Sequence, residues 1–134
     1  YDVANTFKLG TGTVNIIGVD RLDLASTLIA TDAAAVNGTD SGAILSHSIS
    51  NGIISFDDVN SYTTPLAITA TNLADTLGYL QANITGSNTV AFVSEGNTFV
   101  FQDGGATDTL VELVGVTAQS VNTSGLATNA VWII

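Results

Sequence analysis

The chain has 134 residues and a formal net charge of −10, because twelve Asp and Glu residues stand against only two basic ones. This length suits one domain with a buried core. The composition, with 46% hydrophobic and 10% charged residues, is not that of a disordered tail. The charge argues against binding to nucleic acid, which needs a basic surface, and against adsorption on anionic lipid. Cations, basic surfaces and other copies of the chain remain as electrostatic partners.

The residue types that are absent or rare further limit the class of protein to which the sequence can belong. There is no Cys, so disulfides, thiolate nucleophiles and Cys-based zinc sites are excluded. The apolar runs are far shorter than the roughly 20 residues of a membrane-spanning helix, so we expect no membrane span. Abundant Thr, Ser, Asn and Gly, with only Lys8 and Arg21 as basic residues, favour an extracellular or cell-surface protein. Because the chain begins with Tyr1, we expect a processed product or the C-terminal domain of a longer precursor.

Residues 1–134 are expected to form a single β-rich domain that begins with short strands. Residues 13–17 predict one strand, and residues 20–24 alternate polar and apolar side chains as a half-buried strand does. Residues 25–36 fit both an Ala-rich helix and a strand followed by a turn. The polar cluster at residues 37–42 predicts a turn.

A hairpin is the next expected element. Residues 43–49 and 52–56 are both compatible with strands, and Asn51-Gly52 lies between them. Asn-Gly is the strongest short signal for a hairpin turn, since both positions favour positive φ. We therefore expect two antiparallel strands joined at these residues.

One amphipathic helix is predicted in the middle of the chain. Its apolar positions recur at the spacing of one helical face: Leu73, Leu77, Leu80 and Ile84. Thr71 or Asn72 is expected to cap its start, and Asp75 lies in the first turn, where the helix dipole favours an anion. Gly78 costs about 1 kcal/mol relative to Ala inside a helix, which suggests that a strand packs closely there.

The rest of the chain predicts strands at residues 89–94, 98–102 and 110–114, and an apolar terminal strand at residues 129–134. The terminal strand should pair within the sheet or with a neighbour, because an exposed apolar strand is costly. Inner faces are expected from Ala91, Val93, Phe99 and Phe101, and the additional apolar residues Phe92 and Val100 indicate that both faces are at least partly covered. The fold class is thus mainly β: an antiparallel sheet or β-sandwich with one amphipathic helix.

The sequence gives little indication of an enzyme. His47 is the only histidine, no GxSxG motif accompanies it, and on a strand Ser46 and His47 would point to opposite faces. Adjacent carboxylates such as Asp57 and Asp58 point apart for the same reason. We therefore expect no enzymatic activity and assign no catalytic residue.

The loop DGGATDT, which starts at Asp103 and includes Asp108, is the best candidate for a metal site. Calcium prefers oxygen ligands on flexible loops that contain glycine, so Asp103 and Asp108 are the expected ligands. The alternative is a plain hairpin loop in which both aspartates accept hydrogen bonds from backbone N–H groups. The pairs Asp20/Asp23 and Asp57/Asp58 are weaker candidates.

The string GNTFVFQDGGATDTLVELVGV resembles the C-terminal region of bacterial surface-layer and RTX-type proteins exported by type I secretion. VDRLDL (residues 19–24) and LADTLGYLQANI (residues 73–84) are similar to segments of the same family, and the likeness is best over residues 68–117. The glycine-aspartate nonapeptide repeats of the calcium β-roll are absent from this sequence. The resemblance implies an extracellular, calcium-linked and non-enzymatic structural role.

Two functions follow as expectations. The first is a secreted structural protein that assembles with its own copies into a surface layer or extracellular filament. Assembly would proceed by strand pairing, with residues 1–17 and 129–134 reaching a neighbour. The alternative is a monomeric C-terminal adhesin or type I export module of a larger protein, with a cell-surface glycan as its ligand.

Overall fold

The computed structural model describes residues 20–122 and 130–134, and the strand expected at residues 13–17 lies outside them. The fold is mainly β, as predicted, with two sheets and one helix. The larger sheet has the strand order β2 (Ala33–Ser41), β3 (Ile44–Ser50), β4 (Ile53–Asp57), β5 (Thr89–Ser94), β6 (Asn97–Gln102) and β7 (Thr109–Leu113). The smaller sheet has the order β1 (Arg21–Asp23), β9 (Ala130–Ile133) and β8 (Val121–Asn122).

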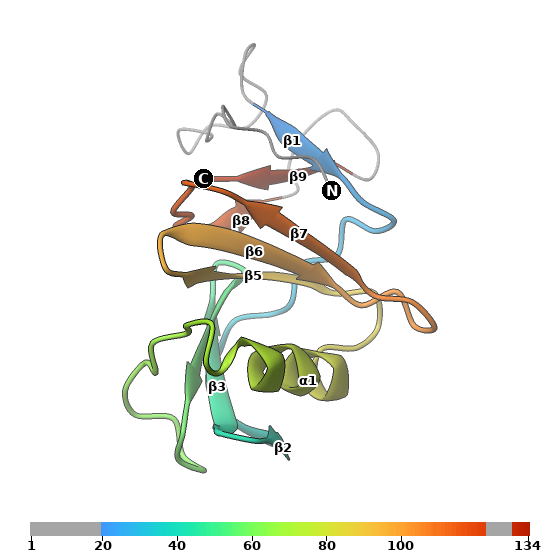
Figure 1. Ribbon diagram of the computed structural model, residues 1–134. Helices are drawn as coiled ribbons and strands as arrows, with labels where there is room; N and C mark the ends of the chain where they lie inside the picture. Colours follow the sequence, from blue (N-terminus) through green and yellow to red (C-terminus); the bar gives the residue numbers. More distant parts are fainter. Residues whose placement is uncertain (1–19, 123–129) are drawn as a thin grey trace.

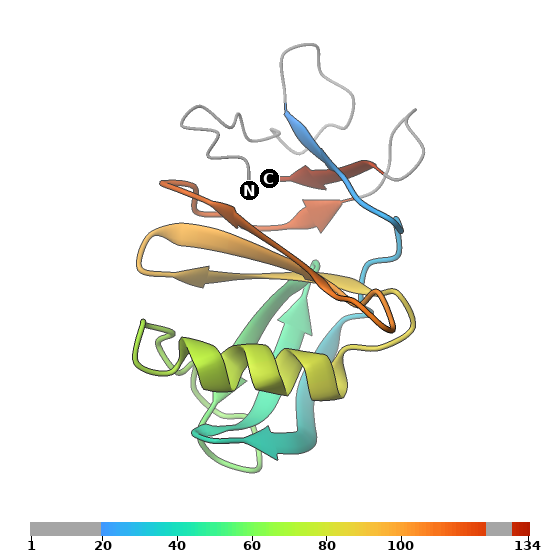
Figure 2. The same cartoon turned by 45° about the vertical axis from the view of Figure 1, so that its right-hand side comes forward.

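The elements are arranged in three layers (Figures 1 and 2). Strands β5–β7 form the middle layer, with the small sheet on one side and α1 (Leu73–Asn83) with strands β2–β4 on the other. The large sheet is antiparallel except between β4 and β5, which pair in parallel at Ile53 and Ala91. The expected sandwich with one helix is therefore present, and one parallel pair makes its large sheet mixed.

Two hairpins have tight two-residue turns, and the one at Asn51-Gly52 is the turn predicted from the sequence. Asn51 and Gly52 have φ values of 51° and 77° between β3 and β4, and Glu95 and Gly96 have 49° and 83° between β5 and β6. Positive φ at both central residues is the type I′ turn, whose twist matches that of the flanking strands. The short connections thus fix the register of both hairpins.

The turn predicted at residues 37–42 is placed differently. Residues up to Ser41 belong to β2, and the chain reverses at Gly42 and Ala43, since Ser41 pairs with Ile44. The register of β2 shifts between Asn37 and Ser41, so the turn-forming residues occupy an irregular edge strand. Residues 33–36, left open between helix and strand, are the start of the same strand.

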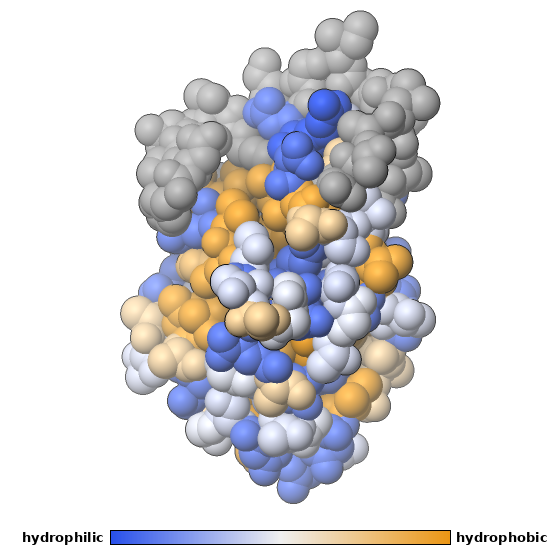
Figure 3. All heavy atoms as spheres, turned by 90° about the vertical axis from the view of Figure 1, so that its right-hand side faces the viewer, coloured by the Kyte–Doolittle hydropathy of each residue, from blue (hydrophilic) through white to orange (hydrophobic). Residues whose placement is uncertain are grey.

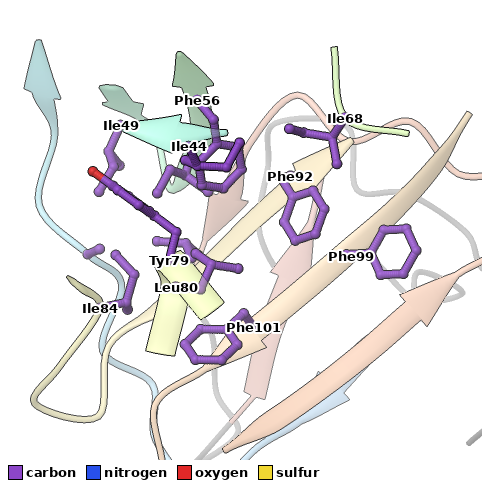
Figure 4. Close-up of a cluster of buried hydrophobic side chains, with 13 residues drawn as sticks. Ile44, Ile49, Phe56, Ile68, Tyr79, Leu80, Ile84, Phe92, Phe99 and Phe101 are labelled. Carbon is purple, nitrogen blue, oxygen red and sulfur yellow. The ribbon is translucent and has the colours of Figure 1, made fainter. Parts of the chain in front are cut away.

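Helix α1 covers one core, which Figure 4 shows around Tyr79, Leu80 and Ile84. Leu80 and Ile84 are buried, and Leu73 and Leu77 pack against this core, as the periodicity predicts. Asn72 occupies the N-cap position but makes no capping bond with its side chain. That side chain instead accepts a hydrogen bond from the N–H of Thr69 and donates one to the carbonyl of Ala67, so it braces the turn before the helix.

Both faces of the middle layer are covered, as the apolar pattern predicts. On the helix side Phe92 lies opposite Phe99 in the first core, and on the small-sheet side Ala91 lies opposite Val100 in a second core. Ala91 therefore shares a face with Val100 and not with Phe99. The strand pairing decides this grouping, which alternation along one strand cannot do.

No helix among residues 20–122 and 130–134 has the length and apolar character needed to cross a membrane.

Candidate functional site

The β6–β7 loop places the two predicted metal ligands at its two ends. Asp103 accepts hydrogen bonds from the N–H groups of Ser87 (2.9 Å) and Gly105 (3.0 Å), one on each carboxylate oxygen. Asp108 accepts one from the N–H of Gly104 (3.2 Å). Both aspartates thus hold the backbone of the loop, as in an Asx-type turn.

The electrostatics of this loop follow from the same bonds. The N–H of Ser87, followed by that of Gly105, lowers the pKa of Asp103, because both donors favour the ionised carboxylate. Among residues 20–122 and 130–134, no three His, Cys, Asp or Glu side chains gather into a group suited to a metal ion. The loop therefore supplies two carboxylates and exposed backbone carbonyls, and water would have to complete the six to eight oxygens of a calcium shell.

The two aspartates of the pair Asp57/Asp58 differ in burial. Asp57 is buried and accepts hydrogen bonds from the N–H groups of Asp58 (2.8 Å), Thr63 (2.7 Å) and Thr64 (3.0 Å). Asp58 is exposed. The hydrogen bond from Thr64, followed by that from Thr63, lowers the pKa of Asp57 to about 2. Asp57 thus holds the segment that follows β4, and its carboxylate oxygens already accept hydrogen bonds from donors of the same chain.

These bonds predict a specific acid sensitivity. A carboxyl whose pKa is lowered by folding stabilises the protein fully above its ordinary pKa, and this contribution is lost as the pH falls through the folded value. For Asp57 the window extends from 3.8 down to about 2. In this window we expect the urea concentration at the unfolding midpoint to depend less on pH in Asp57→Asn than in the wild type. Asp58→Asn, the exposed neighbour, is the control, and equal slopes for Asp57→Asn and the wild type would contradict the assignment.

His47 lies inside the first core and not in an open site. Its side chain is 4% exposed, and its Nδ1 lies 2.9 Å from the hydroxyl oxygen of Tyr79. The backbone N–H of Gly38 faces the same hydroxyl and favours its ionised form, while burial opposes ionisation and raises the pKa of Tyr79. Burial lowers the pKa of His47. The pair joins β3, α1 and β2 in the interior.

A cavity of about 160 Å³ lies where β4 and β5 separate. The segment Pro65–Ile68 enters this fork: the N–H of Leu66 donates to the carbonyl of Phe56 (2.7 Å), and Ile68 forms a bridge with Ser94. The cavity is lined mostly by aliphatic and aromatic side chains, without a titratable group. It is smaller than the roughly 300–1,000 Å³ of common ligand pockets and has no group for acid–base chemistry.

Strand β7 forms one edge of the large sheet. Strand β7 pairs with β6 through five consecutive residues without a bulge, and no other described strand pairs with it. Leu110 is 41% exposed, and Val114, just beyond the strand, is 38% exposed. A regular edge strand with apolar side chains is a template for another strand.

The opposite edge, β2, is irregular and partly covered by its own chain. Its register is interrupted twice. At the second interruption, between Asn37 and Ser41, the N–H of Thr39 donates to the amide oxygen of Asn83 (2.7 Å). The Asn83 amide donates in turn to the carbonyl of Thr39 (2.9 Å). The helix side chain thus takes the place of a neighbouring strand. On the face seen in Figure 3, the lower end of the molecule is mainly hydrophilic, while hydrophobic atoms collect higher up.

The apolar C-terminal strand is already paired on both sides. β9 lies between β1 and β8, and all four of its residues are buried. Its predicted strand character is confirmed, and its partners belong to the same chain. The N-terminal segment at residues 1–17 lies outside the described residues.

Sequence reasoning did not single out the edge of β7. The strand at residues 110–114 was predicted, but an edge exists only once the strand order is known. Comparison with protein-family models, with curated proteins and with solved structures finds no match. Function is therefore inferred from the geometry of the molecule itself.

Proposed function

We propose that this protein is a secreted structural subunit that assembles with copies of itself at the cell surface, as a layer or filament, by pairing of strands. The observation that carries the proposal is the outer edge of β7, which is regular, partly apolar and uncovered by any described strand. Edge strands of this kind are usually protected in proteins that stay monomeric, by bulges, charges, Pro or covering segments.

The other strand edges of the described chain carry such protection. β2 is bulged and bonded to Asn83. β1 has three residues, of which the charged Arg21 and Asp23 are exposed, and β8 has two residues. Short, charged or irregular edges are poor templates for strand addition. The contrast supports β7 as the contact strand.

The composition supports the cell-surface location and a dependence on salt. The chain lacks Cys and has two basic residues in 134, which suits an environment exposed to proteases. Copies with a charge of −10 repel one another, and salt screens this repulsion over about 10 Å at 0.1 M. Assembly should therefore be favoured by salt and by divalent cations.

The test uses Leu110→Glu. We expect this change to shift the mass measured by light scattering toward the 13.6 kDa of a single chain, because it places a charge at an exposed apolar position of the pairing strand. Leu28→Glu is the matched control, since Leu28 is 55% exposed and lies outside the edge. Equal effects of the two variants would contradict the role of β7.

Calcium is the second element of the proposal, with Asp103 and Asp108 as ligands. We expect excess chelator to reduce the assembled mass, and the double variant Asp103→Asn/Asp108→Asn to lose the response to calcium. Asp20→Asn/Asp23→Asn removes the same charge from another cluster and should keep the response. Assemblies of wild-type protein that persist unchanged in chelator would overturn the calcium element and leave strand pairing intact.

A wild-type protein that stays at 13.6 kDa at every salt and calcium concentration would overturn the structural role. The monomeric adhesin or export module would then be the better account, and binding to cell-surface glycans would be the property to measure.

A further inference from the structure

We infer that β7 pairs with β7 of a second copy, antiparallel about a twofold axis that passes beside Val111. This inference rests on the proposed function and specifies its partner, its symmetry and its register. The two large sheets would join into one continuous sheet across the axis.

The symmetry follows from the difference between the two edges of the large sheet. A head-to-tail contact needs two complementary edges, and it produces rings or open fibres. Among the described strands, none pairs with the outer side of β7, whereas β2 at the other edge is interrupted twice and its Thr39 has both backbone groups bonded to Asn83. A strand with one usable edge pairs with its own copy, and such a contact is isologous. The dimer is then the building block, and further growth must use another surface.

The possible registers are few. A twofold axis between antiparallel strands keeps each side chain on its own face of the joint sheet, because residues directly opposite one another point to the same face. The axis must therefore pass beside a residue and not beside a peptide bond. Strand β7 runs from Thr109 to Leu113. The axis leaves several residues of the two strands paired only if it passes beside Leu110, Val111 or Glu112.

Charge selects among these three registers. An axis at Glu112 places that carboxylate opposite its copy, and an axis at Leu110 places Glu112 opposite Asp108. Like charges directly opposite destabilise a strand pair. An axis at Val111 places Val111 opposite Val111, Leu110 opposite Glu112, and Thr109 opposite Leu113, so no two charges meet.

The packing around β7 agrees with this register. Val111 lies opposite Val100 of β6 and packs against the second core, so the axis falls where an apolar side chain is half-buried. Leu110 and Glu112 lie on the other face, opposite Phe101 and Phe99. The Glu112 carboxylate accepts a hydrogen bond from the Asn97 side chain (2.8 Å), which leaves its methylene groups to cover Leu110 of the second copy.

Single cysteines test the register directly, because the natural chain contains none. We expect Val111→Cys, treated with a short bifunctional maleimide, to shift from the chain mass to twice that mass on a denaturing gel. An equimolar mixture of Leu110→Cys and Glu112→Cys should crosslink more than either variant alone. Ala35→Cys, exposed on the opposite edge β2, is the control and should stay at the chain mass.

A charge pair gives a second, independent readout. With the axis at Val111, Leu110→Lys places an ammonium opposite Glu112 of the other copy and should retain or strengthen the dimer in light scattering, whereas Leu110→Glu should abolish it. If Leu110→Lys disrupts as strongly as Leu110→Glu, or if Val111→Cys crosslinks no better than Ala35→Cys while the wild type assembles, the register is wrong and the proposed function stands. A wild type that remains monomeric overturns both.

Discussion

Phe92→Ala is expected to lower the free energy of unfolding by about 3–5 kcal/mol, the usual cost of truncating a buried Phe. Phe92 is 1% exposed and lies at the centre of the first core. Its ring stacks on Phe99 with 5.1 Å between centroids and meets Phe56 edge-on at 5.7 Å. The truncation leaves a cavity between β4, β5 and β6, which the surrounding sheet closes only in part.

Urea unfolding followed by the fluorescence of Trp132 measures this effect. Trp132 is the single tryptophan, lies in β9 and is 4% exposed, between Val131 and Ile133 of the second core in the sequence. If the two cores unfold as one cooperative unit, its signal shifts with the loss of Phe92. Leu28→Ala, at an exposed site, should stay within about 0.5 kcal/mol of the wild type. A Phe92→Ala shift as small as that of the control would contradict the central position of this ring.

Tyr79→Phe is expected to cost about 1–3 kcal/mol, although it removes a single oxygen atom. Tyr79 is fully buried, and its hydroxyl joins His47 Nδ1 at 2.9 Å to the N–H of Gly38. Without the hydroxyl, two polar groups of the interior lose their partner, and the penalty is the desolvation of both. Burial also raises the pKa of Tyr79, so the hydroxyl stays protonated.

The measurement should be made well above pH 6.5, the ordinary pKa of histidine. Burial lowers the pKa of His47, so its contribution to stability is complete above 6.5 and is lost as the pH falls toward the lower folded value. Tyr62→Phe makes the same chemical change at a half-buried site and is the control. An equal and small effect of both variants would show that the His47–Tyr79 hydrogen bond does not stabilise the fold.

Local signals predicted the parts of the fold that depend on local chemistry. Asn51-Gly52 and the apolar period of α1 each restrict the backbone through residues close in sequence. The loop from Asp103 to Asp108 was likewise expected to be either a turn or a metal site. The structure places both aspartates on backbone N–H groups, while calcium there remains a prediction.

Residues 37–42 show why the rest was not predictable. Gly38 resembles a turn residue in the sequence, but in the structure a Cβ at this position would overlap the hydroxyl oxygen of Tyr79. Thr39 bonds to Asn83, forty-four residues away. The helix that packs on β2 requires a glycine and polar residues here. In a single sequence these residues look the same as those of a turn. Glycine at position 78 has a related cause, since a Cβ there would crowd the hydroxyl of Ser41.

The parallel pairing of β4 with β5 is a second unpredicted feature. The two strands meet at Ile53 and Ala91 and then diverge around Pro65–Ile68. Helix α1 lies in the connection between them, which is the usual way to join parallel strands. Which strand is an edge, and hence where a second copy would bind, depends on this order and not on any motif.

The middle position of β9 has a kinetic consequence. In the small sheet β9 pairs with both β1 and β8, and β9 comes from the opposite end of the sequence to β1. Pairings between distant segments form late, because the chain loses loop entropy before it gains contacts. Until β9 docks, the small-sheet side of β5 and β6 remains exposed to water, and the folding chain is most prone to aggregate in that interval.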